Sequence, residues 1–373
     1  MQVLDANAND DKGIRVNTFL ESIGRNSKNS RKSYRTGLHH FAEFLRISKP
    51  GQTPDTIISL SQNQRINQYE LLDQFVSYLL NQHIAIASLK IYIAVVRSFL
   101  EYNDIDISNS KFKREVKMPK AYPDQEEPLT LTDIRELLEY NSNHRLRAFI
   151  LLLVSSGMRA MEACSLRLQD VDFSSSPTKI TIRREYSKTK RIRTIYCSDE
   201  ATKHLLKLIE MHHSSKQPQN LIFALEDGKK PESIYTRILE QFQKLERIAD
   251  KNQRKENSLR RKITLHSLRR TAYSIIGEQT NTDYSNWFLG HHHSVYWTHK
   301  EQERRNIYHT KCMPFLTIYP ETRDNTIEAA LREKDRTIKL LTNRIADIEH
   351  DQKIIIDLLQ EPEQLKKKLE SSD

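Results

Sequence analysis

The sequence predicts a mainly α-helical protein whose second domain carries a small antiparallel β-sheet. Apolar residues recur with helical spacing through most of the 373 residues. One pair of short segments instead alternates polar and apolar residues, as strands do. Glycine is scarce, with 8 in the chain, which argues against an all-β fold with many tight turns.

The N-terminal domain is expected to be entirely helical. Residues 1–12 are polar and are predicted to be disordered, and the domain is expected to span residues 13–108. Helical periodicity is clearest in residues 30–45, 70–81 and 88–102. The first of these stretches places its apolar side chains on one helix face, as a core-facing helix requires.

A basic linker is predicted over residues 109–128. The segment contains two prolines and five basic residues before its acidic end, a composition typical of an extended connection. A new helix is expected after Pro128, where Thr130 or Thr132 can cap the first turn.

The second domain is expected over residues 129–320 and combines helices with a hairpin. Residues 179–183 and 191–196 alternate with a period of two, and the polar residues 187–190 lie between them. This pattern predicts an antiparallel pair of strands with a basic tip.

The C-terminal residues 321–373 are predicted to form an amphipathic helix or short coiled coil followed by a tail. Apolar residues follow one heptad frame, in which the a and d positions are Leu331, Ile338, Leu341, Ile345, Ile348, Ile355 and Leu359. Two further a and d positions of this frame are polar, Lys334 and Gln352. A single helix packed on the second domain fits the same pattern.

The charge of the chain favours a polyanionic partner. Lys and Arg number 59 against 49 Asp and Glu, a net charge of +10, which places nucleic acid ahead of an acidic membrane surface. Three scattered cysteines form no CxxC pair, which fits a reducing cytosol. The longest apolar run, residues 148–154, is too short to span a membrane. We therefore expect a cytoplasmic, nucleoid-associated protein with no membrane partner.

Protein side chains can cleave a phosphodiester without a metal. That reaction needs a nucleophile, cations that hold the non-bridging oxygens, and an acid for the leaving 5′-oxygen. Arginine binds phosphate through a planar fork and stays charged. Tyrosine can attack phosphorus and keep the bond energy in a covalent phosphotyrosine. Patterns GxxxxGK[ST] and GxGxxG are both absent from the sequence, which argues against nucleotide-driven chemistry.

The first segment that carries such groups includes Gly157, Arg159 and Glu162. Gly157 follows an apolar helix and can end it, so that Arg159 emerges at the turn. Glu162 lies one helical turn further on and can hold the Arg159 side chain.

Three further segments follow in order along the chain. The hairpin tip carries Lys188. His266 and Arg269 are three residues apart on a predicted helix and share a face. The last segment contains the sequence Leu-Gly-His that ends at His291, followed by Tyr296.

These four segments resemble the tyrosine recombinase family, which includes phage integrases and Xer proteins. The boxes of that family read like SGxRxxExxxLxxxD, HxLRxT, and LGH followed by a nucleophilic tyrosine, and they are matched here in the same order. The resemblance covers about residues 15–320. It implies the tyrosine-recombinase catalytic fold behind an all-α, SAM-like core-binding domain, and it implies that Glu162 orients Arg159.

The resemblance also implies roles for the other motif residues. Arg159 and Arg269 would clamp the scissile phosphate, and His291 would contact it. His266 would hydrogen-bond the phosphate and assist proton transfer from the tyrosine. Lys188 would be the general acid for the 5′-hydroxyl. Adjacent side chains such as those after His291 point apart on a helix or turn, so the histidine run there is not expected to bind a metal.

The nucleophile departs from the usual spacing. In most family members the tyrosine follows the histidine of the LGH box by nine residues, a position that Lys300 occupies here. Tyr296 is our first choice, because the residues around it resemble the nucleophile segment of archaeal and archaeal-virus integrases. Tyr308 is the second choice, with packing as its alternative role, and Tyr284 is a remote third.

By the same resemblance, the protein would close as a clamp on double-stranded DNA with a specific target site and act as a homotetramer. Lys190 is an alternative to Lys188 as the general acid. The residues expected to contact DNA are Lys90, Arg97, Lys111, Lys113, Arg114, Lys190 and Arg270.

The predicted function is that of a site-specific DNA recombinase (integrase) of a mobile element. It would cleave and rejoin strands through a 3′-phosphotyrosine, without metal, ATP or another cofactor. Two alternatives are a DNA-binding architectural or regulatory protein with a decayed active site, and a nicking and closing enzyme similar to type IB topoisomerases.

Overall fold

The structure is a computed structural model in which the chain forms two compact units, residues 1–125 and 126–373. The described residues are 13–120, 129–187, 190–212, 217–226, 228–254, 261–291, 300–320, 334, 337–345, 348–349 and 352. Among them, no helix has the length and apolar character needed to cross a bilayer.

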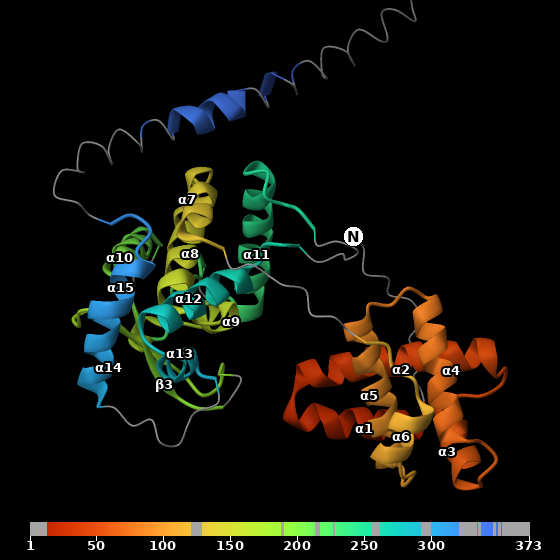
Figure 1. Cartoon of the computed structure of the whole chain (residues 1–373). Coiled ribbons are helices and arrows are strands. Elements are labelled where there is room, and N and C mark those ends of the chain that lie inside the picture. Colours follow the sequence, from red (N-terminus) through yellow and green to blue (C-terminus); the bar gives the residue numbers. More distant parts are fainter. Residues whose placement is uncertain are drawn as a thin grey trace, which may run out of the picture. The chain divides into compact units, whose positions relative to one another are not determined.

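The first unit is all helical, with its helices coloured red to yellow in Figure 1. Side-chain caps start several of them, such as Ser27, whose hydroxyl accepts from the backbone N–H of Ser30. The helices are α1 (Ile14–Asn26), α2 (Lys28–Ser48), α3 (Pro54–Gln62), α4 (Gln68–Asn81), α5 (Ile86–Tyr102) and α6 (Asn109–Glu115).

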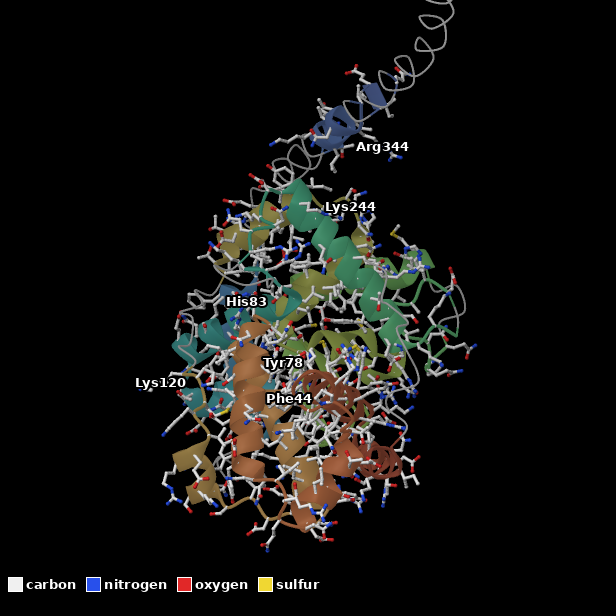
Figure 2. The ribbon with its side chains drawn as sticks, turned by 90° about the vertical axis from the view of Figure 1, so that its right-hand side faces the viewer. Phe44, Tyr78, His83, Lys120, Lys244 and Arg344 are labelled. Carbon is white, nitrogen blue, oxygen red and sulfur yellow. The ribbon has the colours of Figure 1, made fainter. Side chains whose placement is uncertain are left out.

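Aromatic side chains fill the core of the first unit. Phe41 on α2 and Phe75 on α4 are fully buried and meet edge to face, with ring centroids 5.3 Å apart. Figure 2 shows the neighbouring pair Phe44 and Tyr78, whose ring centroids are 5.6 Å apart. These contacts join the helices predicted over residues 30–45 and 70–81.

Helix α6 corrects the expected linker over residues 109–128. Phe112 is buried, and the backbone N–H of Lys117 donates to Asp73 Oδ1 on α4 at 2.9 Å. Phe112 and Val116 form an apolar pair four residues apart, which is enough to fold a short basic helix onto the unit. The first part of the segment therefore belongs to the first unit, and residues 121–128 lie outside the described residues.

The second unit is built around α8 (His144–Ser156), which is buried from Arg145 to Ser156 and contacts α10, α12 and β3 (Figure 1). Thr130 caps α7 by accepting from the N–H of Asp133, so Thr130 is the cap residue of the two candidates. The other helices are α7 (Leu131–Glu139), α9 (Ala160–Cys164), η1 (Leu168–Asp170), α10 (Asp199–His212), α11 (Pro231–Ile248), α12 (Leu265–Gln279), α13 (Thr282–Leu289), α14 (Glu301–Ile307), the π turn η2 (Tyr308–Cys312) and α15 (Met313–Leu316).

The sheet of the second unit has three antiparallel strands in the order β1-β2-β3. The strands are β1 (Val171–Asp172), β2 (Thr178–Ile182) and β3 (Arg193–Cys197). Ile180 pairs with Ile195, and both are fully buried. The predicted hairpin is therefore present, and the expected fold class of a mainly helical chain with a small antiparallel sheet is confirmed.

The C-terminal segment is helical over the described residues 337–345. Ile338, Leu341 and Ile345 are each more than half exposed there, as is Ile348. The remaining apolar heptad positions, at residues 331, 355 and 359, lie outside the described residues.

Candidate functional site

A glycine turn places Arg159. Helix α8 ends at Gly157, which has the left-handed conformation φ 59°, ψ 14°. A Cβ atom at Gly157 would come within 3.2 Å of Leu289 Cγ and 3.3 Å of Ala272 Cβ, so this turn requires glycine for its conformation and for its contacts. The chain then turns into α9 with Arg159 as the residue before the first helical position.

The carboxylate of Glu162 lies at the centre of the site with no exposed surface. Arg159 donates to it twice, from its backbone N–H at 2.8 Å and from Nη1 at 3.0 Å. Arg193 donates from Nη1 at 3.0 Å and from Nη2 at 2.6 Å. Burial raises the pKa of Glu162, but the hydrogen bonds and charges of Arg193 and Arg159 outweigh it, so the pKa is lowered overall and Glu162 is ionised.

Arg269 on α12 connects the first and last motif segments. Its guanidinium donates to the carbonyl oxygen of Gly157, and Nη2 donates to that of Leu289 at 2.7 Å. Burial, followed by the positive charge of Arg159, lowers the pKa of Arg269 to about 9, so Arg269 remains protonated at neutral pH.

His291 is held in one tautomer. Arg269 Nη2 lies 3.2 Å from His291 Nε2, and a guanidinium has no acceptor, so Nε2 accepts and the proton resides on Nδ1. Nδ1 then donates to Asn286 Oδ1 at 3.3 Å, an oxygen that also accepts from the Tyr273 hydroxyl. Burial first, and then the charge of Arg269, lowers the pKa of His291 and favours its neutral form.

His266 lies in the first turn of α12 and is largely exposed. Partial burial first, and then the charges of Arg269 and Arg159, lowers the pKa of His266. A neutral imidazole at the surface beside two arginines can accept a proton from an approaching hydroxyl. The lowered pKa favours the neutral form of His266.

Two of the predicted catalytic residues, Lys188 and Tyr296, lie outside the described residues. The structure describes the chain up to the buried Ser187 on one side of the hairpin tip and from the exposed Lys190 on the other. It describes the chain up to His291 before Tyr296 and from Lys300 after it.

The alternative tyrosines are both buried. The Tyr308 side chain has no exposed surface, and its hydroxyl donates to the carbonyl oxygen of Ser155 at 2.9 Å. Tyr284 donates to the carbonyl oxygen of Arg304 at 2.9 Å. Burial raises the pKa of both hydroxyls, to well above the ordinary value in Tyr308. These placements disfavour either residue as a nucleophile.

The residues expected to contact DNA differ in their exposure and in their contacts with other side chains. Lys90 and Lys113 are exposed, as are Arg114, which pairs with Glu115 at 3.2 Å, and Lys190. Lys111 lies over the ring of Tyr69, and Arg270 donates to Ser267 Oγ at 3.1 Å.

Arg97 makes two contacts within the first unit. Its guanidinium donates to Asn109 Oδ1 at 2.9 Å and lies 4.3 Å from the ring centroid of Phe112. Both contacts hold α6 on α5, because the guanidinium supplies a hydrogen bond and a cation–π contact to the same short helix. Arg97 therefore has a structural role in the first unit.

Arg193 contacts the site through Glu162 but is not one of the motif residues. It shares a strand face with Ile195 and Cys197, both buried, so an arginine there requires a buried carboxylate as its partner. The alternation of side chains between the two faces of β3 was the sequence signal that could have identified Arg193 as a residue on the buried face. Asn286 and Tyr273, which orient His291, had no comparable signal.

Comparisons with known proteins find similarity to tyrosine recombinases. The phage integrase family model matches residues 127–300. Tyrosine recombinase XerA of Pyrococcus horikoshii is 28% identical over 159 residues, which are 43% of this chain and 47% of that protein. Tyrosine recombinase XerD of Rickettsia prowazekii is 26% identical over 211 residues, which are 53% of this chain and 63% of that protein. The matches thus span between about half and two thirds of these relatives.

Solved structures show the same fold. A lambda integrase dimer bound to a COC′ core site has a TM-score of 0.55 at 14% identity, covering 80% of this chain and 94% of that one. A lambda integrase tetramer bound to a Holliday junction has a TM-score of 0.54 at 14% identity, covering 77% and 79%. The order of the motifs, the match over residues 127–300 and the shared fold agree, and residues 127–300 belong to the phage integrase family of tyrosine recombinases.

Proposed function

We propose that the protein is a site-specific DNA recombinase (integrase) that cleaves and rejoins strands through a covalent 3′-phosphotyrosine intermediate. The observation that carries the proposal is the bonding of Arg269. Its guanidinium joins the Gly157 turn, which presents Arg159, to the Leu289 carbonyl and His291 of the last motif. Three segments distant in sequence are thereby brought to one place.

The cluster of Arg159, Arg193 and Arg269 suits the transition state of phosphoryl transfer. Charge builds on the non-bridging oxygens during phosphoryl transfer, and preorganised cations lower the barrier. Arg159 keeps a quarter of its side-chain surface exposed, while Glu162 is already bound bidentately by Arg193. The site therefore holds more guanidinium than carboxylate charge, and Arg159 can present its fork to the phosphate. These cations supply the charge that a metal ion provides in other nucleases, so the reaction proposed is metal-free.

The proposed reaction uses the two predicted residues that lie outside the described residues, Lys188 and Tyr296. The Tyr296 oxygen attacks phosphorus and forms the P–O bond as the P–O5′ bond breaks. His266 accepts the phenolic proton, and Lys188 donates a proton to the leaving 5′-oxygen. Rejoining is the reverse reaction, in which a 5′-hydroxyl attacks the phosphotyrosine. Bond energy is conserved throughout, so no ATP is consumed.

The proposed partner is double-stranded DNA with a specific target site, bound in the cytoplasm by four protomers on two sites. Exposed lysines such as Lys90 and Lys113 would contact phosphates, so affinity should fall with salt. The exposed apolar residues Ile338, Leu341 and Ile345 would add contacts between protomers. Deletion of residues 324–373 should then reduce the number of protomers in the assembly on DNA, as determined by light scattering, and an unchanged number of protomers would contradict this role.

The test uses the full chain and a pool of nicked suicide duplexes with a randomised core. Cleavage beside the nick releases a short strand, so an SDS-resistant protein–DNA adduct accumulates, and sequencing the trapped DNA identifies the target. We expect an adduct that forms equally well with EDTA. Loss of the adduct in EDTA would contradict the metal-free reaction. DNA binding without any adduct would support the architectural alternative, and supercoil relaxation by a monomer would support the nicking and closing enzyme.

A further inference from the structure

Arg193 is the main partner of the buried Glu162 carboxylate. It binds both carboxylate oxygens, at 2.6 and 3.0 Å, and its own side chain is only 8% exposed. Arg159 offers one side-chain bond, from Nη1. A bidentate arginine–carboxylate pair fixes the plane of both groups, so Arg193 determines how the carboxylate of Glu162 is oriented.

This arrangement leaves the Arg159 guanidinium able to bind a ligand. A buried carboxylate must have its charge and its lone pairs satisfied, since an unpaired one is costly. Arg159 already donates to both oxygens, to Oε2 from its backbone N–H and to Oε1 from Nη1, so without Arg193 it is the remaining donor that the described contacts give this carboxylate. Arg159 would then turn its fork onto Glu162 and away from the exposed side on which a phosphate would bind.

Arg193 also contacts the last motif segment. A Cβ atom at Gly290 would lie 2.9 Å from both Cδ and Nε of Arg193, so the glycine backbone rests against the guanidinium. Gly290 has φ 71° and directly precedes His291. Arg193 is also the first residue of β3, on the strand that returns from the hairpin tip. One residue of β3 thereby contacts both the Glu162 carboxylate and the turn before His291.

We propose that Arg193 is a positioning residue that keeps Arg159 directed at the scissile phosphate by holding Glu162 from the opposite side. The expected effect of Arg193 on the cleavage rate rests on the proposed recombinase function. Its expected effect on the position of the Arg159 side chain does not. Arg193 touches no reacting atom in this account and acts through Glu162.

A structure of the Arg193→Gln variant without DNA tests the structural consequence. We expect Arg159 to move so that its guanidinium binds both oxygens of Glu162, because the carboxylate has lost its bidentate partner. The matched control is Arg191→Gln, which removes the same charge from an exposed residue two positions earlier. An Arg159 side chain that keeps its single bond to Glu162 in Arg193→Gln would overturn the proposal, whether or not the protein is a recombinase.

The kinetic test measures adduct formation at saturating concentrations of the duplex that wild-type protein selects from the randomised pool. We expect Arg193→Gln to slow cleavage about a hundredfold, as a misplaced catalytic group does, without a change in the apparent Kd for the duplex. Arg193→Lys should recover part of the rate, because it restores the charge but not the fork. Arg191→Gln should cleave at the wild-type rate.

A double-mutant cycle separates positioning from general structural support. If Arg193 acts through Glu162, the variant Arg193→Gln/Glu162→Gln should be no slower than the slower single variant. Rate losses that multiply, or a loss in Arg193→Gln that merely follows a lower melting temperature, would contradict the proposal. Absence of an adduct in the wild-type protein would refute the proposed function, and the structure of Arg193→Gln would still decide the role of Arg193.

Discussion

The hydroxyl of Tyr308 donates a hydrogen bond to the carbonyl oxygen of Ser155, 2.9 Å away in the core of the second unit. The Tyr308 ring stacks on Phe288 with centroids 5.2 Å apart and has no exposed surface. Ser155 lies two residues before the Gly157 turn, so this tyrosine supports the end of α8 from within. Its hydroxyl could reach a phosphate only if η2 left the core.

Replacement of Tyr308 by Phe should therefore affect stability and leave cleavage intact. The buried Ser155 carbonyl would lose this donor, which lowers the free energy of unfolding by about 1–2 kcal/mol. Urea unfolding measures that change, and the suicide duplex measures the adduct. A variant that keeps wild-type stability but forms no adduct would identify Tyr308 as the nucleophile.

Replacement of Gly157 by Ala should impair both stability and cleavage. The left-handed backbone costs an alanine about 1–2 kcal/mol, and the contacts with Leu289 and Ala272 add to this cost by shifting the turn that presents Arg159. Gly228 is the matched control, since it has φ 74° but no atom within 4 Å of an added Cβ. Gly228→Ala should lose stability without a change in the cleavage rate per folded molecule. Equal cleavage by the two variants would contradict the role of the Gly157 turn.

The lowered pKa of His291 predicts a loss of stability in mild acid. Its ordinary value is 6.5, and burial and Arg269 lower the pKa in the folded protein. Below 6.5 the unfolded chain binds more protons at this residue than the folded one, so stability falls as the pH falls towards the folded value. His40 and His204 shift in the same direction, so the comparison with His291→Gln isolates this contribution. Urea unfolding over a pH series should give a shallower acid slope for that variant, and identical slopes would refute the assignment.

Arg97 and Lys90 should separate structural from DNA-binding roles within α5. Arg97→Ala removes the contacts to Asn109 and Phe112 and should lower the free energy of unfolding by about 1 kcal/mol. Lys90→Ala should leave stability unchanged and, by removing one phosphate contact, reduce the slope of log affinity against log salt by about 1. The reverse pattern in unfolding and DNA-binding titrations would show that Arg97 faces DNA.

Local sequence patterns predicted the parts of the site that local geometry determines. A glycine after an apolar helix placed Arg159 at a turn, and the three-residue spacing to Glu162 made their contact available. The family was recognisable for the same reason, since its boxes are short segments in a fixed order. Arg193 was missed because its importance depends on the strand register and on a partner 31 residues away, which no local motif encodes.

Composition predicted the segment after residue 108 less well. Its lysines and prolines are typical of a linker, yet burial of Phe112 is enough to fold α6 onto the first unit. The same fold gives Arg97 its structural role, because a long basic side chain can pack its guanidinium against an aromatic ring as readily as it can face solvent. The average polarity of a segment does not show whether its basic side chains pack against an aromatic ring or face solvent.

The most direct test of the central claim is to identify the residue that becomes covalently joined to DNA. Wild-type protein trapped on its selected suicide duplex should yield, after nuclease digestion, a peptide in which mass spectrometry finds the nucleotide on Tyr296. The Tyr296→Phe variant should bind the duplex with unchanged affinity and form no adduct. A nucleotide on any other residue, or an adduct that persists in Tyr296→Phe, would contradict the account.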